Sequence, residues 1–272
     1  MFPHCAGHCQ GLQSGSVDMR SERPMHDSVM YLLLLVGTFL AAGVVKGVTG
    51  MGLPTVAMGL LGTVMPPAAA AAILVVPSFV TNVWQLFSGP SVVQPVRRLW
   101  PMMLCIVIGT VGGSALLVWV NPVWSGFGLG VALIVYATYA LVAPAFSVPR
   151  RIEWWLSAVI GLITGVVTGA TGVFVMPAVP YLGSLDMNRE ELVQALGLSF
   201  TVSTVALAIG LFTYGAFQVG QLGTSMMAIV PALIGMWAGR LVRLRISPRR
   251  FRQCFLLFLI ALGLELSFRP FL

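Results

Sequence analysis

A glycine-dense segment, Val44–Pro54, interrupts an apolar run that extends from Val29 to Met65. Its three glycines and one proline remove packing side chains and a backbone donor, so the sequence predicts that a helix stops here. Peptide groups freed in this way cost several kcal/mol each in hydrocarbon. Such a break is therefore tolerated only where protein or a watery cavity surrounds it. Lys46, the only lysine of the chain, lies inside this first break.

A second break of the same kind lies at Val166–Pro177, where Gly169-Ala170-Thr171-Gly172 repeats Gly47-Val48-Thr49-Gly50. The correspondence continues beyond the breaks, in Ser78-Phe79 with Ser199-Phe200 and in Asn82 with Ser203. We interpret the chain as a duplication. Interrupted apolar segments at corresponding places in two halves are the best sequence indication of a transporter's binding site.

The composition indicates an integral membrane protein. Hydrophobic residues make up 58% of the chain and charged residues only 8%, whereas soluble domains have roughly 25% charged residues. Spans of about 20 residues would use nearly the whole chain and leave little for a separate soluble domain. The net charge of +7 comes from arginines between apolar segments, where they set membrane orientation rather than bind nucleic acid.

The sequence predicts three parts. Residues 1–28 form a polar tail that we expect to be disordered, 29–148 form the first transmembrane repeat, and 149–272 form the second. The tail contains His4-Cys5-x-x-His8-Cys9, a spacing that zinc sites can use. A complete metal site usually needs a folded frame for its ligands, so we favour a tail without metal.

The apolar segments 53–65, 154–167 and 173–183 are too short to cross about 30 Å of hydrocarbon. We therefore interpret 29–65 and 154–183 as broken helical hairpins. If all arginine-rich loops are cytoplasmic, each hairpin enters and leaves on one side and the two repeats are inverted. A parallel duplication with four spans per half is the alternative, and it would place one of these loops on the outer side. The loops in question contain Arg97-Arg98, Arg150-Arg151, and Arg240, Arg243, Arg245, Arg249, Arg250 and Arg252.

The expected fold is thus an all-α polytopic membrane protein. It has two inverted repeats, each a broken helical hairpin plus three transmembrane helices, with about eight membrane-embedded spans in all. The small-residue stripes Gly109-x-x-x-Gly113 and Gly235-x-x-x-Gly239 have the spacing of helix packing contacts, and we expect them to serve packing rather than chemistry.

The first break with its lone lysine, the segment Pro77–Gln85 and the degenerate second break together resemble the TauE/SafE sulfite exporter family of membrane permeases. The resemblance covers about residues 29–268. It implies a permease of the bacterial inner membrane for sulfur-containing anions such as sulfite, thiosulfate or organosulfonates, with proton coupling as an option. The second break has Phe174 where the first has Gly52, so the two breaks need not contribute equally.

Lys46 is the first candidate for anion binding. Helix starts that face a cavity present free N–H groups and a positive dipole end, and a lysine would add a point charge beside them. A charge at membrane depth is costly, which indicates that Lys46 faces the interior of the bundle. The alternative is that Lys46 extends to the membrane surface from the end of the first helix.

The other candidates are polar or glycine positions in the breaks and in the apolar helices that follow. The threonines could instead cap the interrupted helices, and the other polar groups could form interhelical hydrogen bonds. Glu265, the only acid in a long apolar run, is either a proton carrier or a carboxylate paired with Arg269. The full set of candidate substrate-binding residues is Lys46, Thr49, Gly50, Asn82, Gln85, Thr171, Gly172, Ser199 and Ser203.

Secondary transport is the function that these features favour, with a passive anion channel as the alternative. An enzyme would need a nucleophile, paired carboxylates or clustered histidines at membrane depth, and the only histidines are His4, His8 and His26. The chain also has no phosphate-binding loop of the kind that ATP-driven pumps use. We expect a small anion and the lipid bilayer as partners, without cofactor, metal or nucleic acid, and leave a homodimer open.

Overall fold

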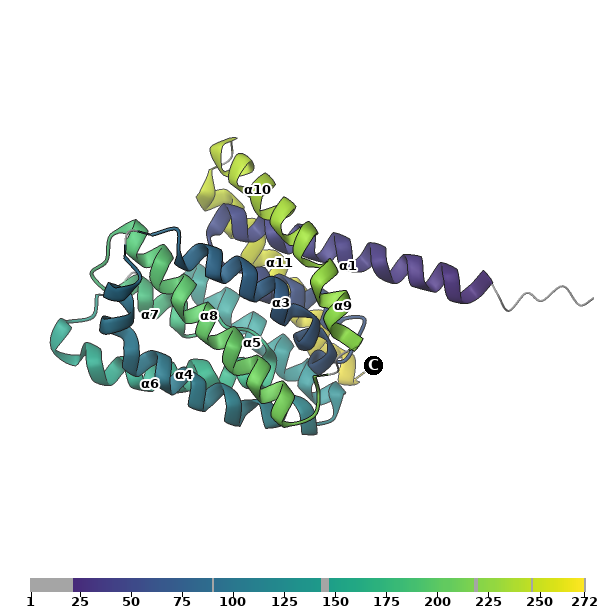
Figure 1. Cartoon of the computed structure of the whole chain (residues 1–272), viewed down its shortest axis with the longest axis horizontal. Coiled ribbons are helices and arrows are strands. Elements are labelled where there is room, and N and C mark those ends of the chain that lie inside the picture. The colour runs from purple at the N-terminus through teal and green to yellow at the C-terminus, as the bar shows by residue number, and fades with distance from the viewer. Residues whose placement is uncertain (1–21, 90, 143–146, 218–219, 246, 272) are drawn as a thin grey trace, which may run out of the picture. The chain divides into compact units, whose positions relative to one another are not determined.

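The computed structural model describes residues 22–89, 91–142, 147–217, 220–245 and 247–271. Within these ranges the chain is helical and has no strand, as expected (Figure 1). Eight of its helical stretches are long and apolar enough to cross a membrane, which agrees with the predicted number of spans. The His-Cys motif of the N-terminal tail lies outside the described residues.

The chain from Leu35 to Leu272 forms one compact unit, and the description below concerns this unit. Two short helices, α9 and α10, together form a single span at Leu222–Arg245. The helices are α1 (Glu22–Thr49), α2 (Leu53–Gly62), α3 (Pro67–Leu86), α4 (Val93–Trp119), α5 (Pro122–Val142), α6 (Arg150–Thr171), α7 (Ala178–Ser184), α8 (Arg189–Thr213), α9 (Gly220–Met227), α10 (Ile229–Arg245) and α11 (Pro248–Phe268), followed by a 3-10 turn at Arg269–Phe271.

The first break is a tight turn between α1 and α2. The chain reverses at Gly50 and Gly52, whose φ angles of 80° and 97° are left-handed and favour glycine. The helix before the turn continues to Thr49 and so ends inside the segment Val44–Pro54, as expected, with Lys46 in its last helical turn. Gly47 remains helical because it packs against another helix, and this contact outweighs its low intrinsic helix propensity.

The second break has the same plan. Helix α6 ends at Gly172, whose φ is 72°, and the short helix α7 follows. The expectation that 154–167 is too short to span was wrong, because the helix extends over 22 residues from Arg150 to Thr171. The helices that follow the breaks are short: α2 has ten residues and α7 has seven.

The arginines expected in loops lie instead in the end turns of helices. Arg97 and Arg98 are in α4, and Arg150 is the first residue of α6. The C-terminal cluster is divided between the end of α10 and the start of α11. Helices longer than the hydrocarbon can extend into the headgroup region, where arginine side chains reach water, so a polar flank need not end a helix.

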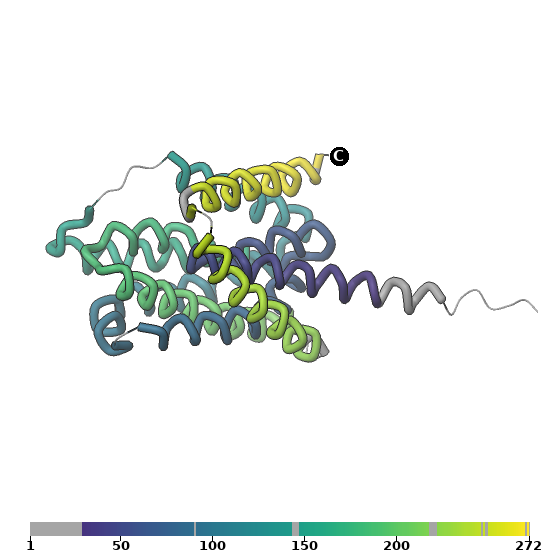
Figure 2. Tube along the Cα trace, turned by 90° about the horizontal axis from the view of Figure 1, so that it is seen from above, coloured from purple at the N-terminus to yellow at the C-terminus, as the bar shows by residue number. Residues whose placement is uncertain are grey.

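The order of elements is the same in both halves (Figures 1 and 2). In each half a long helix, a glycine break and a short helix are followed by three long helical stretches. The first half contains α1 to α5, and the second contains α6 to α11, with α9 and α10 counted as one stretch.

Glycines form two close helix contacts, one between α1 and α10 and one between α4 and α6. A Cβ atom on Gly47 would lie 2.3 Å from the carbonyl oxygen of Met236, and one on Gly109 would lie 2.5 Å from that of Leu162. The backbones therefore touch without intervening side chains, as small residues allow in membrane helices. The expected packing role of the stripes that start at Gly109 and Gly235 is confirmed.

The helices run parallel in both of these contacts, because residue numbers rise together along each pair. In the first contact Leu40 meets Gly235 and Val44 meets Gly239; in the second Met102 meets Gly161 and Thr110 meets Gly169. Helices α3 and α8, which lie side by side, run antiparallel instead. In that pair Asn82 bonds to Thr204, and Gln85 bonds to the backbone of Val193.

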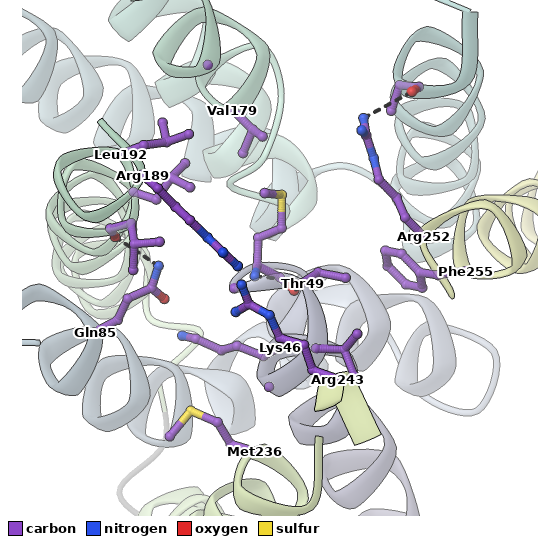
Figure 3. A pocket seen from close by; sticks show the side chains of 18 of the residues that line it. Lys46, Thr49, Gln85, Val179, Arg189, Leu192, Met236, Arg243, Arg252 and Phe255 are labelled. Atoms are coloured by element: carbon purple, nitrogen blue, oxygen red, sulfur yellow. Dashed lines mark hydrogen bonds between the residues drawn. The ribbon is translucent and has the colours of Figure 1, made fainter. Parts of the chain in front are cut away.

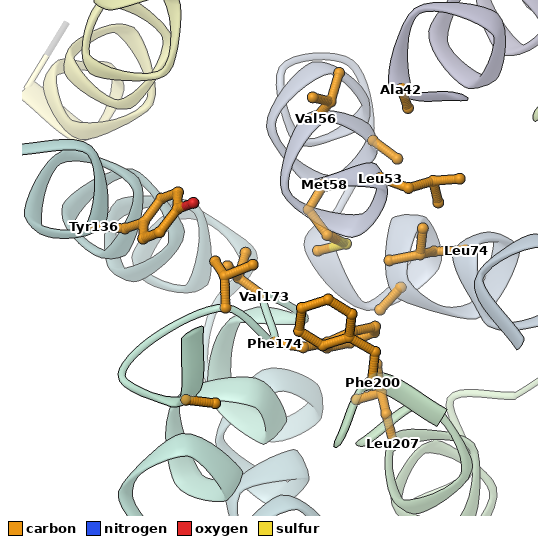
Figure 4. Packing of buried hydrophobic residues seen from close by; sticks show 14 of the residues in the cluster. Ala42, Leu53, Val56, Met58, Leu74, Tyr136, Val173, Phe174, Phe200 and Leu207 are labelled. Atoms are coloured by element: carbon orange, nitrogen blue, oxygen red, sulfur yellow. The ribbon is translucent and has the colours of Figure 1, made fainter. Parts of the chain in front are cut away.

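The core lies where α2, α3 and α8 meet the second break (Figure 4). Met58, Leu74, Phe174 and Phe200 are all fully buried there, and the two phenylalanine rings lie 6.4 Å apart. Large apolar side chains on the outside of the bundle are exposed, among them Leu104 on α4. Such exposure is expected where a helix faces lipid rather than water.

Candidate functional site

A cavity of about 1070 Å³ lies beside the first break. The turn itself lines it with residues Lys46 to Met51, and α3, α5, α7, α8, α10 and α11 supply the remaining wall (Figure 3). The first break is thus surrounded by protein and a cavity, the setting that an interrupted membrane helix requires.

Lys46 reaches this cavity from the last turn of α1, although its side chain is only 3% exposed. Its Nζ donates to Thr81 Oγ1 at 3.1 Å and to Asn82 Oδ1, both on α3. Asn82 Nδ2 in turn donates to Thr204 Oγ1 on α8 at 3.2 Å. A chain of hydrogen bonds therefore links the lysine to both halves of the protein.

The charge of Lys46 has no carboxylate partner among the described residues. Their two ion pairs are Arg98 with Glu153, at 2.6 Å, and Arg150 with Asp186, at 3.8 Å. A buried cation held only by neutral oxygens pays a large desolvation cost, and an anionic ligand would offset that cost. Lys46 is thus placed to attract an anion. It does not extend to the membrane surface, because its ammonium is held between α1 and α3.

Arginines from three other helices line the same cavity. Arg189 begins α8, Arg240 and Arg243 lie near the end of α10, and Arg252 lies near the start of α11. With Lys46 they make five basic residues, and the described lining contains no aspartate or glutamate. Positive charge from four helices therefore faces one cavity, which favours anions over cations there.

Sequence reasoning missed these arginines as site residues, because it used them only to orient the chain. Their placement near the ends of apolar segments is visible in the sequence, but only the packed bundle brings these ends of α8, α10 and α11 together. Arg252 also donates through Nη2 to the backbone oxygen of Ala140 at 3.1 Å, which holds it against the end of α5.

Thr49 and Thr171 occupy equivalent places and use their hydroxyls in the same way. Thr49 Oγ1 lies 2.8 Å from the carbonyl oxygen of Val45 and accepts from the N–H of Met51 at 3.2 Å. Thr171 Oγ1 lies 2.7 Å from the oxygen of Val167 and accepts from the N–H of the second residue after it. Both hydroxyls thus hold the turn, the capping arrangement considered above.

The candidate residues fall into two groups. Lys46, Thr49, Gly50 and Gln85 line the cavity, and Asn82 supports Lys46 from behind. The four candidates that the sequence suggested in the second half, Thr171, Gly172, Ser199 and Ser203, are absent from its described lining. Ser199 and Ser203 are instead fully buried, and their hydroxyls have no partner among the described residues.

Glu265 lies near the end of α11, is exposed, and does not line the cavity. Neither of the two ion pairs among the described residues joins it to Arg269. The structure therefore connects Glu265 neither with the expected salt bridge nor with the basic cavity.

Eight helical stretches of membrane length, a duplicated helical break and a basic cavity beside the first of the two breaks are the features of a multi-pass membrane transporter. The sequence model of the sulfite exporter TauE/SafE family matches residues 34–266, and the chain belongs to this family of transporters. It is therefore not an enzyme. A search of curated proteins and a search of solved structures both gave no match.

Proposed function

We propose that the protein is a secondary transporter of small sulfur-containing anions, such as sulfite, thiosulfate or organosulfonates, and that it binds them in the cavity beside the first break. One observation carries the proposal. Lys46 is buried on neutral acceptors in a cavity whose described lining has five basic residues and no acidic one. The family membership supports the choice of a sulfur oxyanion among small anions.

The proposed binding mode uses Lys46 as the deepest contact. Two of its three N–H donors are taken by Thr81 and Asn82, which leaves one for an anion oxygen. The arginines nearer the surface, such as Arg189 and Arg252, would draw the anion toward this point from water. The cavity, at about 1070 Å³, is slightly larger than the about 300–1,000 Å³ usual for ligand pockets, so an organosulfonate or several waters would also fit.

We also propose that the two halves are inverted relative to each other. The hairpin of α6 and α7 supports this: Tyr181 of α7 bonds back to Ser157 and to the backbone of Glu153, near the start of α6. This hairpin returns to the end at which it began. The hairpin of α1 and α2 is supported in the same way, because Gly52 lies near Phe255 at the start of α11 and Gly62 lies near Leu266 at its end.

An odd number of crossings per half follows from two such hairpins, each followed by three full spans. The second half then begins on the opposite side of the membrane from the first. The parallel contacts of α1 with α10 and of α6 with α4 fit this arrangement. Each contact pairs the first helix of one half with the second of the three long stretches that follow the break in the other half. By the positive-inside rule the arginine-rich end of the bundle lies on the cytoplasmic side of a bacterial inner membrane, and the cavity faces that side.

Cysteine labelling tests this topology. In a version without its own cysteines, Arg97→Cys, Arg151→Cys and Arg250→Cys should be protected from an impermeant external thiol reagent, whereas Asn121→Cys should react. Labelling at position 250 without labelling at 97 would contradict the inverted arrangement and favour a parallel duplication.

Uptake into proteoliposomes tests the function. We expect saturable uptake of at least one of sulfite, thiosulfate, sulfate, taurine and sulfoacetate, and accumulation above the outside concentration when a proton gradient is imposed. A passive channel would only equilibrate the anion. Absence of saturable flux for the whole panel would contradict the proposed substrate class.

A further inference from the structure

We propose that Lys46 is also the proton carrier of the transporter: its ammonium neutralises the bound anion, and it releases its proton when the anion leaves. The inference rests on the proposed function and deepens it, because it identifies the coupling ion and the group that carries it. Its basis is the hydrogen bonding and the surroundings of Lys46 in the cavity.

The acceptors around Lys46 suit both of its protonation states. An ammonium has three N–H donors and a neutral amine has two. The two acceptors are Thr81 Oγ1 and Asn82 Oδ1, and both are neutral oxygens. Loss of the third proton would therefore leave every bond from Lys46 to α3 in place, so the side chain need not move when it changes charge.

Neighbouring bonds fix these acceptors in the orientation that Lys46 needs. Thr81 Oγ1 lies 2.8 Å from the carbonyl oxygen of Pro77, to which it can donate, so its lone pairs face the lysine. The amide of Asn82 donates to Thr204, and this bond turns its oxygen toward the lysine. The third N–H of Lys46 has no acceptor among the described residues and is the one that an anion can take.

The charge balance of the cavity also depends on the ligand. A carboxylate beside Lys46 would keep it protonated at all times, but neither ion pair of the described chain includes it. With an anion present the ammonium has a counter-charge. Without one, an isolated ammonium in a buried site costs free energy that a neutral amine does not.

The other titratable groups of the cavity cannot take this role. Arg189, Arg240, Arg243 and Arg252 line it from α8, α10 and α11, and a guanidinium does not lose its proton in proteins. Tyr136 and Tyr139 line it from α5, and a tyrosine that lost its proton would become a second anion beside the substrate. Lysine is the basic side chain that adopts both protonation states when buried.

The proposed step is a simple proton transfer. When the anion departs, one N–H bond of Lys46 breaks, the electron pair stays on Nζ, and the proton passes to water in the cavity. Binding reverses the step, since Nζ takes a proton from water as the anion enters. One proton then crosses with each anion, so the cycle moves no net charge for a monoanion such as hydrogen sulfite and one negative charge for a dianion such as thiosulfate.

Lys46→Arg is the direct test, because arginine keeps the charge but cannot release it. In proteoliposomes loaded with thiosulfate, we expect Lys46→Arg to retain anion exchange without a proton gradient within about tenfold of wild type, as the loss of one good hydrogen bond allows. Accumulation driven by an imposed proton gradient should be lost. Arg151→Lys, an exposed exchange of the same two residue types outside the cavity, is the matched control and should keep both activities.

A binding measurement in detergent separates this inference from the proposed function. With a pH-indicator dye in weak buffer, wild-type protein should take up protons when thiosulfate is added, and Lys46→Arg should not. Asn82→Asp, which places a carboxylate beside the lysine, should bind thiosulfate more weakly and, at saturating thiosulfate, without proton uptake, and it gives the same test if Lys46→Arg fails to insert. Proton-driven accumulation by Lys46→Arg, or anion binding by wild type without proton uptake, would overturn the inference. Absence of any anion binding by wild type would instead overturn the proposed function.

Discussion

The two glycine breaks begin from nearly the same sequence but lie in different surroundings. In the first, a Cβ atom on Gly50 would meet nothing within 4 Å, and the turn lines a basic cavity. In the second, a Cβ atom on Gly172 would lie 2.8 Å from Met58 Cε, and Phe174 fills the place that corresponds to Gly52. The position of Lys46 is taken in the second half by Thr168, a fully buried neutral residue.

The difference shows which features of the duplication are structural and which are specific to one copy. Both breaks keep a left-handed glycine after the long helix and a threonine whose hydroxyl holds the turn. The charge and the open space belong only to the first. A repeated backbone thus provides two equivalent turns, and single side chains decide which turn meets a ligand.

Phe174→Ala should have the largest effect on stability. Removing a fully buried phenylalanine costs about 3–5 kcal/mol in a packed core, and Phe174 is not part of the described lining of the cavity. Thermal unfolding in detergent measures the effect. Phe79→Ala, at an exposed position of α3, is the control and should change stability little. An equal loss of thermal stability in both variants would show that the side chain of Phe174 is not tightly packed at the second break.

Lys46→Met should have the largest effect on binding. Loss of a charged hydrogen bond costs about 1.5–3 kcal/mol, so the substrate concentration for half-maximal flux should rise on the order of tenfold to a hundredfold. Thr168→Val changes the equivalent position of the second half and should leave this concentration nearly unchanged. An unchanged value in Lys46→Met would remove the residue from the site.

Much of this comparison could be predicted from the sequence. The glycines, the duplicated motif and the lone lysine indicated two breaks with a substrate site between them, and Phe174 indicated that the two copies need not contribute equally. The ends of the helices could not be predicted, because Gly47 and Gly169 stay helical through contacts with α10 and α4 that are distant in the sequence. The arginines of the cavity were missed for the same reason, since only the packed bundle brings their helix ends together.

Thr171, Gly172, Ser199 and Ser203 were included because the duplication suggested that both halves contribute in the same way. Packing decides otherwise for the described cavity. Phe174 and Phe200 occupy the space beside the second break, and no sequence pattern states whether a gap between helices is filled or empty.

Gly172→Ala should destabilise the protein more than Gly50→Ala. Each alanine must adopt a left-handed conformation, which costs about 1–2 kcal/mol, but only the one at position 172 also displaces a neighbour, Met58. Thermal unfolding of the two variants in the same detergent compares them. The reverse order would mean that the first turn is the more tightly packed one.

Arg243→Gln should have the smallest effect of the four. The side chain lines the cavity and is partly exposed, so its interaction with an anion is screened by water and salt. We expect an increase of about threefold in the half-saturating concentration at low salt and less at high salt. Arg151→Gln, also at the arginine-rich end but outside the cavity, should show no such salt-dependent change. A loss as large as that of Lys46→Met would place the anion near the surface instead.

The parallel contact of α1 with α10 has a consequence for biogenesis. Ribosomes complete α1 early and α10 late, yet the backbone of Gly47 lies directly against that of Gly239. Membrane helices insert one by one before they pack. The first helix must therefore remain in the lipid without this neighbour until nearly the whole chain has been synthesised. During that time Lys46, which is buried in the finished bundle, is not yet covered by the other helices. Truncation before α10 should leave α1 without its neighbour and make the shortened chain a substrate for membrane quality control.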